Sequence, residues 1–148
     1  MDYQEFIIII LSVVGILILS GCAGNITGNT VVDPSGSVKI PLSDLSEKAK
    51  FYEYDDGGVK ISYFAVLGSD GEPRTAFDAC DVCGGSKGYR QTGNDITCNN
   101  CGKVFSIDGL GTRNKGYGCW PSYLPHYVQG DDLLINVNDI KAGRHKFA

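Results

Sequence analysis

The stretch CDVCGGSKGYRQTGNDITCNNCGK, residues 80–103, contains the motif Cys-x-x-Cys-Gly twice. Cys80 and Cys83 form the first pair, and Cys98 and Cys101 form the second. A tight turn of this kind points two sulfurs at one place, and the glycine that follows lets the chain turn away at positive φ. Two such knuckles that face each other make a tetrahedral four-sulfur site. The sequence therefore predicts a metal site with these four cysteines as ligands.

Paired cysteines also attach haem, act as redox pairs and form structural disulfides. Neither pair is followed by the histidine that a covalent haem attachment requires. A thioredoxin-like redox pair would open a helix in a βαβ unit, whereas strand-like segments surround both pairs here. Structural disulfides suit an oxidising compartment, although they would leave one cysteine unpaired among those after Cys22. A chain held by structural disulfides, without metal, therefore stays as an alternative.

The spacing of the cysteines does not identify the metal. Four thiolates suit zinc, a single iron ion and a 2Fe–2S cluster alike. The chain carries no twin-arginine signal, the mark of export in the folded, metal-loaded form. A chain exported unfolded would acquire its metal outside, which favours a single ion over a preassembled cluster. The expected cofactor is a single iron or a 2Fe–2S cluster, with zinc as the alternative.

The first part of the chain is strongly apolar. Residues 6–19 read FIIIILSVVGILIL, which is shorter than the roughly 20 residues of a comfortable bilayer span and suits a signal-peptide core. The next residues, LSGC at 19–22, resemble the lipobox of secreted lipoproteins, in which Cys22 would carry the lipid. No Lys or Arg precedes the run, so an uncleaved hydrophobic helix is the alternative. Either way, we expect residues 1–22 to tether the chain to a membrane on its extracytoplasmic side.

The remainder divides into a linker and one domain. Residues 23–37 are rich in Gly, Asn, Ser and Thr, which indicates a flexible linker. Residues 38–148 are long enough for one independent core and carry β-type patterns. The predicted strands are VKIPL (38–42), KFYEY (50–54), VKISYFAVL (59–67), RTAFDA (74–79), DITC (95–98), KVFSI (103–107) and DLLINV (132–137).

Two local signals complete this pattern. The segment GSDGEP, residues 68–73, predicts a hairpin turn through its Asp70-Gly71 pair. Only SDLSEKAK, residues 43–50, has a helical character, with Ser43 as its N-cap.

Charge and motifs exclude several functions. The chain holds 13 Lys and Arg against 17 Asp and Glu, for a formal net charge of −4. This balance argues against nucleic acid as a partner and against electrostatic docking to anionic lipid. The sequence has no Ser-His-Asp order, no carboxylate pair with an evident catalytic role and no phosphate-binding glycine loop. We therefore expect no enzymatic activity.

Five further residues each allow a functional and a structural interpretation. Cys119 is either a fifth sulfur beside the site or a buried cysteine next to an aromatic residue. We expect the second, because free cysteines are among the most buried residues. His126 and His145 have no partner at ligand spacing, so we expect them to be surface or core residues. Asp78 and Asp81 flank the first ligand and are expected to be solvated loop carboxylates rather than groups that tune it.

The blocks AFDACDVCGGSKGYRQTGNDITCNNCGKVFSIDGLGT (76–112) and GYGCWPSYLP (116–125) closely resemble the membrane iron–sulfur, FtrD-like family. The resemblance covers the chain from about residue 38 to its C-terminus. It implies metal binding by the four paired cysteines, with Cys119 as an additional family cysteine. It also implies a link to ferrous-iron uptake systems that carry redox components. Larger members have several transmembrane helices, whereas this chain has a single apolar segment, so the role of those helices is not carried over.

The order of the elements is also similar to that of Rieske domains. A strand delivers the first pair, a Gly-rich connection follows, and PSYLPHYVQGDDLLINV (121–137) closes the domain. Cys83 and Cys101 would then stand where Rieske proteins have histidines. Rubredoxins and zinc ribbons share the knuckle, so this is a likeness of layout only.

The predicted fold is mainly β: a small Rieske-like or rubredoxin-like domain with two knuckles, preceded by an N-terminal hydrophobic helix. The expected function is electron transfer or iron handling for a membrane iron-transport or redox protein. The alternatives are a zinc ribbon that serves as a structural or interaction module, and a disulfide-stapled lipoprotein without metal.

Overall fold

The structure, a computed structural model, describes residues 28–29, 32–84, 87–111 and 118–148. The predicted membrane tether, with the lipidation site Cys22, lies outside these residues, as does most of the predicted linker. Within the described residues, no helix has the length and apolar character needed to cross a membrane.

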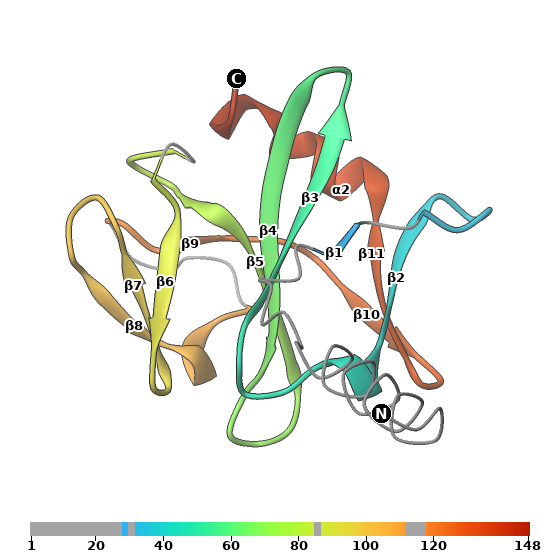
Figure 1. Cartoon of the computed structure of the whole chain (residues 1–148), viewed down its shortest axis with the longest axis horizontal. Helices are drawn as coiled ribbons and strands as arrows, with labels where there is room; N and C mark the ends of the chain where they lie inside the picture. The colour runs from blue at the N-terminus through green and yellow to red at the C-terminus, as the bar shows by residue number, and fades with distance from the viewer. Residues whose placement is uncertain (1–27, 30–31, 85–86, 112–117) are drawn as a thin grey trace, which may run out of the picture.

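The domain is mainly β, as the sequence predicts, and its strands form three sheets that lie side by side (Figure 1). The central sheet has the order β1-β3-β4-β5-β9, and its strands are β1 (Gly28–Asn29), β3 (Lys50–Asp56), β4 (Val59–Leu67), β5 (Pro73–Cys80) and β9 (Pro121–Tyr123). The back sheet has the order β10-β11-β2 and consists of β10 (Tyr127–Gln129), β11 (Asp132–Asn136) and β2 (Ser37–Pro41). The knuckle sheet has the order β6-β7-β8 and consists of β6 (Tyr89–Thr92), β7 (Asp95–Cys98) and β8 (Val104–Ser106).

Short helices follow some of these strands. They are η1 (Leu42–Asp44), η2 (Ile107–Gly109), α2 (Val137–Ala142) and η3 (Arg144–Lys146). In Figure 1 the knuckle sheet and the back sheet lie on opposite sides of the central strands, and α2 lies at the back-sheet end.

β4 contributes to two separate cores because successive side chains of a strand point to opposite faces. Its residues Ile61 and Tyr63 belong to the first core, and Phe64 and Val66 belong to the second. The first core also contains Val38, Ile40, Leu45, Tyr52, Ala65, Phe77, Ala79, Leu124, Leu133, Ile135 and Ile140. The second core also contains Ala76, Cys80, Tyr89, Ile96, Cys98, Ile107, Leu110 and Cys119. The back sheet and α2 therefore cover one face of β4, and the knuckle sheet covers the other.

The predicted strands are confirmed, and β4 has the predicted bounds of residues 59–67. The turn between β4 and β5 also forms as predicted. The Gly71 N–H donates to the Gly68 carbonyl at 2.9 Å, and Gly71 has a φ of 79°. This left-handed conformation suits glycine, which has no Cβ.

The predicted helix over residues 43–50 is wrong. Only the single turn η1 forms, and its N-cap is Pro41, which makes no side-chain cap hydrogen bond, instead of Ser43. Lys50 already belongs to β3, where it pairs with Ala65 of β4. A segment this short cannot offset the cost of helix nucleation, so sheet pairing prevails. The helix α2 was not predicted from the sequence, and its N-cap Asn136 accepts a hydrogen bond from the Asn138 N–H at 2.8 Å.

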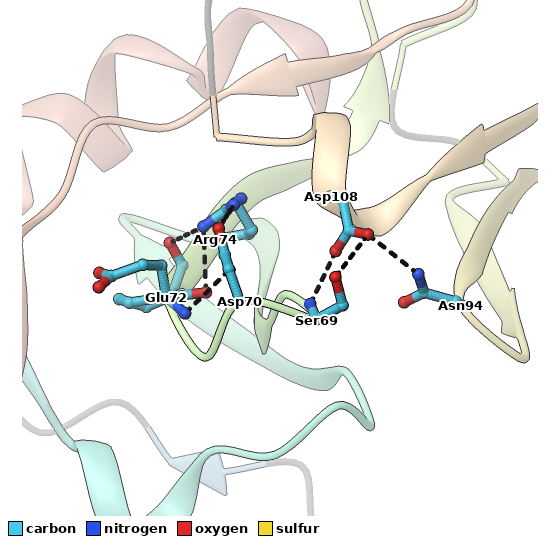
Figure 2. Close-up of polar contacts among 7 residues, drawn as sticks. Ser69, Asp70, Glu72, Arg74, Asn94 and Asp108 are labelled. Carbon is cyan, nitrogen blue, oxygen red and sulfur yellow. Dashed lines mark hydrogen bonds and ion pairs between the residues drawn. The ribbon is translucent and has the colours of Figure 1, made fainter.

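A polar network ties the knuckle sheet to the central sheet (Figure 2). Asp108 of η2 accepts hydrogen bonds from the Ser69 N–H at 2.7 Å and from the Ser69 hydroxyl at 2.9 Å. Its carboxylate also accepts from the Asn94 amide of the β6–β7 turn at 3.3 Å. Beside it, Asp70 of the β4–β5 turn and Arg74 of β5 form an ion pair at 2.7 Å. These contacts fix the position of the knuckle sheet relative to β5, which carries the first cysteine.

Candidate metal centre

The first knuckle begins where β5 ends at Cys80. The Gly84 N–H donates to the Cys80 carbonyl at 3.1 Å and closes the turn, and Gly84 has a φ of 69°. Inside the turn, the Cys83 N–H donates to the Cys80 Sγ at 2.7 Å. The knuckle thus supplies both a sulfur and a backbone donor that stabilises its negative charge.

The second knuckle repeats this construction where β7 ends at Cys98. The Gly102 N–H donates to the Cys98 carbonyl at 2.9 Å, and Gly102 has a φ of 73°. The N–H groups of Asn100 and Cys101 hydrogen-bond the Cys98 sulfur, and the Lys103 N–H hydrogen-bonds the Cys101 sulfur. The two copies of the motif therefore form two knuckles with the same backbone closure, as the sequence predicts.

A third segment brings Cys119 to the same place. β9 pairs with β5, and in this register Pro121 lies opposite Cys80. The Asp81 N–H also donates to the Trp120 carbonyl at 3.3 Å. Because Cys119 lies two residues before Pro121, this pairing places it beside the first knuckle. It belongs to the second core, where only 8% of it is exposed.

Four sulfurs converge at the junction of these segments. The Sγ atoms of Cys80, Cys83, Cys98 and Cys119 all lie within 4.8 Å of one another. The Cys83 and Cys119 sulfurs are 3.7 Å apart. A tetrahedral ion with metal–sulfur bonds of about 2.3 Å separates its ligands by about 3.8 Å, so this donor set fits one thiolate-bound ion. Cys80 and Cys98 are each 2% exposed, so their side of the site is shielded from water.

Cys101, the remaining predicted ligand, lies at the rim of this group. It is exposed, and its thiol contacts the thiols of Cys98 and Cys119. The structure thus brings three of the predicted ligands together with Cys119 and places the fourth predicted ligand next to them. The identity of the ligands stays a prediction. All five cysteines in the described part of the chain are free thiols.

The environments of the thiols divide them into two kinds. The Asn100 amide donates to the Cys83 Sγ at 3.0 Å and lowers the pKa of that thiol, and a backbone N–H lowers the pKa of Cys101. Burial raises the pKa of Cys98, and contacts with the neighbouring thiols of Cys101 and Cys83 raise the pKa of Cys119. Without a cation the thiols of Cys98 and Cys119 keep their protons. A bound metal ion would replace them, because a metal binds the thiolate form.

Aromatic side chains close the site on its inner side. The Tyr89 hydroxyl donates to the Cys119 carbonyl at 2.9 Å, and the rings of Phe105 and Trp120 meet edge to face at 5.2 Å. The Tyr89 N–H donates to Asp78 at 2.6 Å. Asp78 lies in β5 and is half-buried, so its prediction as a solvated loop residue is wrong. Instead, its carboxylate holds the start of β6 in place.

The other residues singled out from the sequence lie outside the thiol group. Asp81 is exposed and accepts a hydrogen bond from the Ser122 hydroxyl at 2.5 Å. His126 lies 2.7 Å from the buried Thr75 hydroxyl, and His145 contacts a backbone carbonyl of α2 at 2.9 Å. Neither histidine joins the thiol group.

Comparison with known proteins assigns the domain to a family. A family model described as "Membrane iron-sulfur containing protein FtrD-like" matches residues 45–147. This range contains both knuckles and the segment with Cys119. No curated protein and no solved structure matches the chain significantly.

Proposed function

Because this chain belongs to the FtrD-like family of membrane iron–sulfur proteins, we propose that its thiol group holds iron and carries single electrons for a membrane partner of iron uptake. The observation that carries the proposal is the group of four sulfurs within 4.8 Å of one another. When bound, iron would supply a one-electron couple. The potential of such a site follows from ligand charge, N–H···S bonds and exposure.

The residues of the chain supply each of these factors. The thiols of Cys80, Cys83, Cys98 and Cys119 would provide the ligand charge. The Cys83 N–H and the Asn100 amide donate to sulfur and lower the cost of that charge. Phe105 and Trp120 exclude water from one side. These roles need no bond-making residue, so we propose an electron carrier rather than an enzyme.

The compactness of the thiol group favours a single iron over a cluster. One ion holds its four ligands at the corners of one tetrahedron, whereas the two irons of a 2Fe–2S cluster hold their ligand pairs farther apart. All four sulfurs of the group lie within 4.8 Å of one another, which fits one ion. The matching closure of the two knuckles supports a rubredoxin-like arrangement, and the Rieske-like layout is the weaker analogy. Zinc accepts the same donors and is the second candidate, as a structural ribbon.

The location is part of the same proposal. We expect residues 1–22 to anchor the chain, by a lipid on Cys22 or by an uncleaved helix, with the domain on the extracytoplasmic side. The exposed rim of the site carries apolar side chains: Val82, within the first knuckle, is 67% exposed, and Val104, just after the second, is 58% exposed. Apolar side chains beside the thiols suit brief contact with a partner protein.

The test is metal analysis on the full chain, purified without oxygen in detergent. We expect about one iron per chain, visible absorbance and no acid-labile sulfide, as a single thiolate-bound ion requires. Cys98→Ser should lose the iron and the colour, while His145→Gln, which alters a nitrogen donor outside the thiol group, should keep both. Circular dichroism of each variant would confirm that the strands still form.

Other outcomes would replace the proposal. Two iron ions and two acid-labile sulfides per chain would indicate a 2Fe–2S cluster. One colourless zinc per chain would overturn electron transfer and leave the zinc ribbon. A metal-free chain whose cysteines are oxidised in pairs would leave the disulfide-stapled lipoprotein.

A further inference from the structure

The site has more sulfurs than a four-coordinate ion can use. Five free cysteines meet at the junction of the two knuckles and β9. Thiolate sites of this class close with four ligands in a tetrahedron, so one thiol is left over. The doubled motif suggests that the extra thiol is Cys119, which lies outside it. The geometry indicates a different arrangement.

Exposure and distance separate the candidates for the fourth ligand. Cys119 is 8% exposed, and its sulfur lies within 4.8 Å of the sulfurs of Cys80, Cys83 and Cys98. Cys101 is exposed and lies outside that group, although its thiol contacts both Cys98 and Cys119. The thiols thus form a continuous series from the surface to the interior, with Cys101 at the outer end.

We propose that Cys119 completes the inner ligand set and that Cys101 is a spare thiol which receives an incoming metal ion and passes it inward. This inference rests on the proposed metal-binding function. The ion would bind first to the accessible sulfurs of Cys101 and the half-buried Cys83. Cys119 would then replace Cys101 by exchange of one sulfur for another between adjacent ligands.

The exchange of Cys101 for Cys119 on the ion needs no redox step. An aqueous ferrous ion gives up its water ligands, and the four inner cysteines each release a proton to solvent as they bind. Cys101 releases a proton when it first binds the ion and takes one up again when it leaves as a thiolate, so the net release is one proton from each inner cysteine. The iron stays ferrous throughout, so no oxidant or reductant is needed. Adjacent thiols are the requirement, and the contacts of Cys101 with Cys98 and Cys119 meet it.

The first experiment is alkylation of the full chain loaded with ferrous iron, without oxygen, followed by peptide mapping. A metal-bound thiolate is shielded from alkylating reagents, so the labelled cysteine is the one that holds no metal. Leaving Cys22 aside, we expect fast labelling of Cys101 and protection of the other four. Labelling of Cys119 with protection of Cys101 would overturn the inference and leave the proposed function intact. Protection of all five would also overturn it, and a chain that binds no iron would overturn both.

A matched pair of variants provides the second readout. Cys101→Ser should reach the same iron content and the same visible spectrum as the native chain but should load several-fold more slowly in stopped-flow mixing with ferrous iron. Cys119→Ser should bind iron more weakly in competition with a chelator and should show a shifted spectrum, because an oxygen would replace a sulfur ligand. If Cys101→Ser shows the shifted spectrum and Cys119→Ser does not, the roles are reversed and the inference fails.

Discussion

The two faces of β4 pack against two different kinds of core. On one face, Ile61 and Tyr63 pack against the back sheet in a core built from apolar and aromatic side chains. On the other, Phe64 and Val66 pack against the knuckle sheet in a core that also buries three cysteines. The first core contains no group of metal-ligating side chains among the described residues. The second gathers thiols at the spacing of metal ligands, so a cation would complete it. The two faces should therefore depend on different conditions for their stability.

Metal removal should have the largest effect and should be confined to one face. Thiolate-bound structural ions contribute apparent binding free energies of about 10–16 kcal/mol in small domains, so their loss weakens the elements that hold them. With a chelator under reducing conditions, we expect faster amide hydrogen exchange in β6–β8 and little change in β2 and β11. Mass spectrometry of exchanged peptides measures both. Equal loosening of both faces would contradict the division into two cores.

A cavity in the first core should lower the stability of the fold without changing its metal content. Ile135 of β11 is fully buried in the first core. We expect Ile135→Ala to lower the free energy of unfolding by about 2–5 kcal/mol, because it leaves a cavity. The metal content per folded chain should not change. Urea denaturation and metal analysis provide the two measurements, with Val128→Ala, on the exposed β10, as a control with little effect. Loss of metal in Ile135→Ala would mean that the cores are coupled.

Two glycines next to β6 test how closely the knuckle sheet packs against Asp78 of β5. Gly88 and Gly93 have φ values of 58° and 59°, so alanine at either position costs about 1–2 kcal/mol of backbone strain. A Cβ at Gly88 would lie 2.4 Å from an Asp78 oxygen, whereas a Cβ at Gly93 would meet nothing within 4 Å. We expect Gly88→Ala to destabilise the domain by about 1–3 kcal/mol more than Gly93→Ala, the usual cost of overpacking. Equal losses in urea denaturation would show that Asp78 moves freely.

The smallest effect should come from the titration of His126, which lies outside the two cores. Burial lowers the pKa of His126, whose Nδ1 lies 2.7 Å from the Thr75 hydroxyl. Since the unfolded state takes up the proton first, stability should fall as the pH drops below the ordinary value of 6.5 toward the lowered folded pKa. His126→Gln should flatten this part of the curve of unfolding free energy against pH. An unchanged slope would show that the imidazole is solvated in the folded protein.

Much of this fold follows from local patterns in the sequence. VKISYFAVL became β4 because its β-branched and aromatic residues suit a strand buried on both sides. The knuckles followed from the Cys-x-x-Cys-Gly spacing, since their closure involves only neighbouring residues. The Asn136 N-cap could have revealed α2, but the signal is weak for so short a helix.

The rest depended on contacts between distant parts of the chain. The place of Cys119 is set by the register of β9 on β5, where Pro121 lies opposite Cys80. Such long-range pairing has no local sequence signal. Which of Cys119 and Cys101 joins the group of four sulfurs could therefore not be predicted. The same holds for Asp78, whose role depends on the approach of Tyr89.

An anaerobic redox titration of the full chain, followed by visible absorbance, tests the central claim most directly. The account predicts a single reversible one-electron transition that is present in the native chain and in Cys101→Ser and absent from Cys98→Ser. A colourless protein that holds zinc, or an iron site that does not change between strongly reducing and oxidising potentials, would contradict electron transfer as the function.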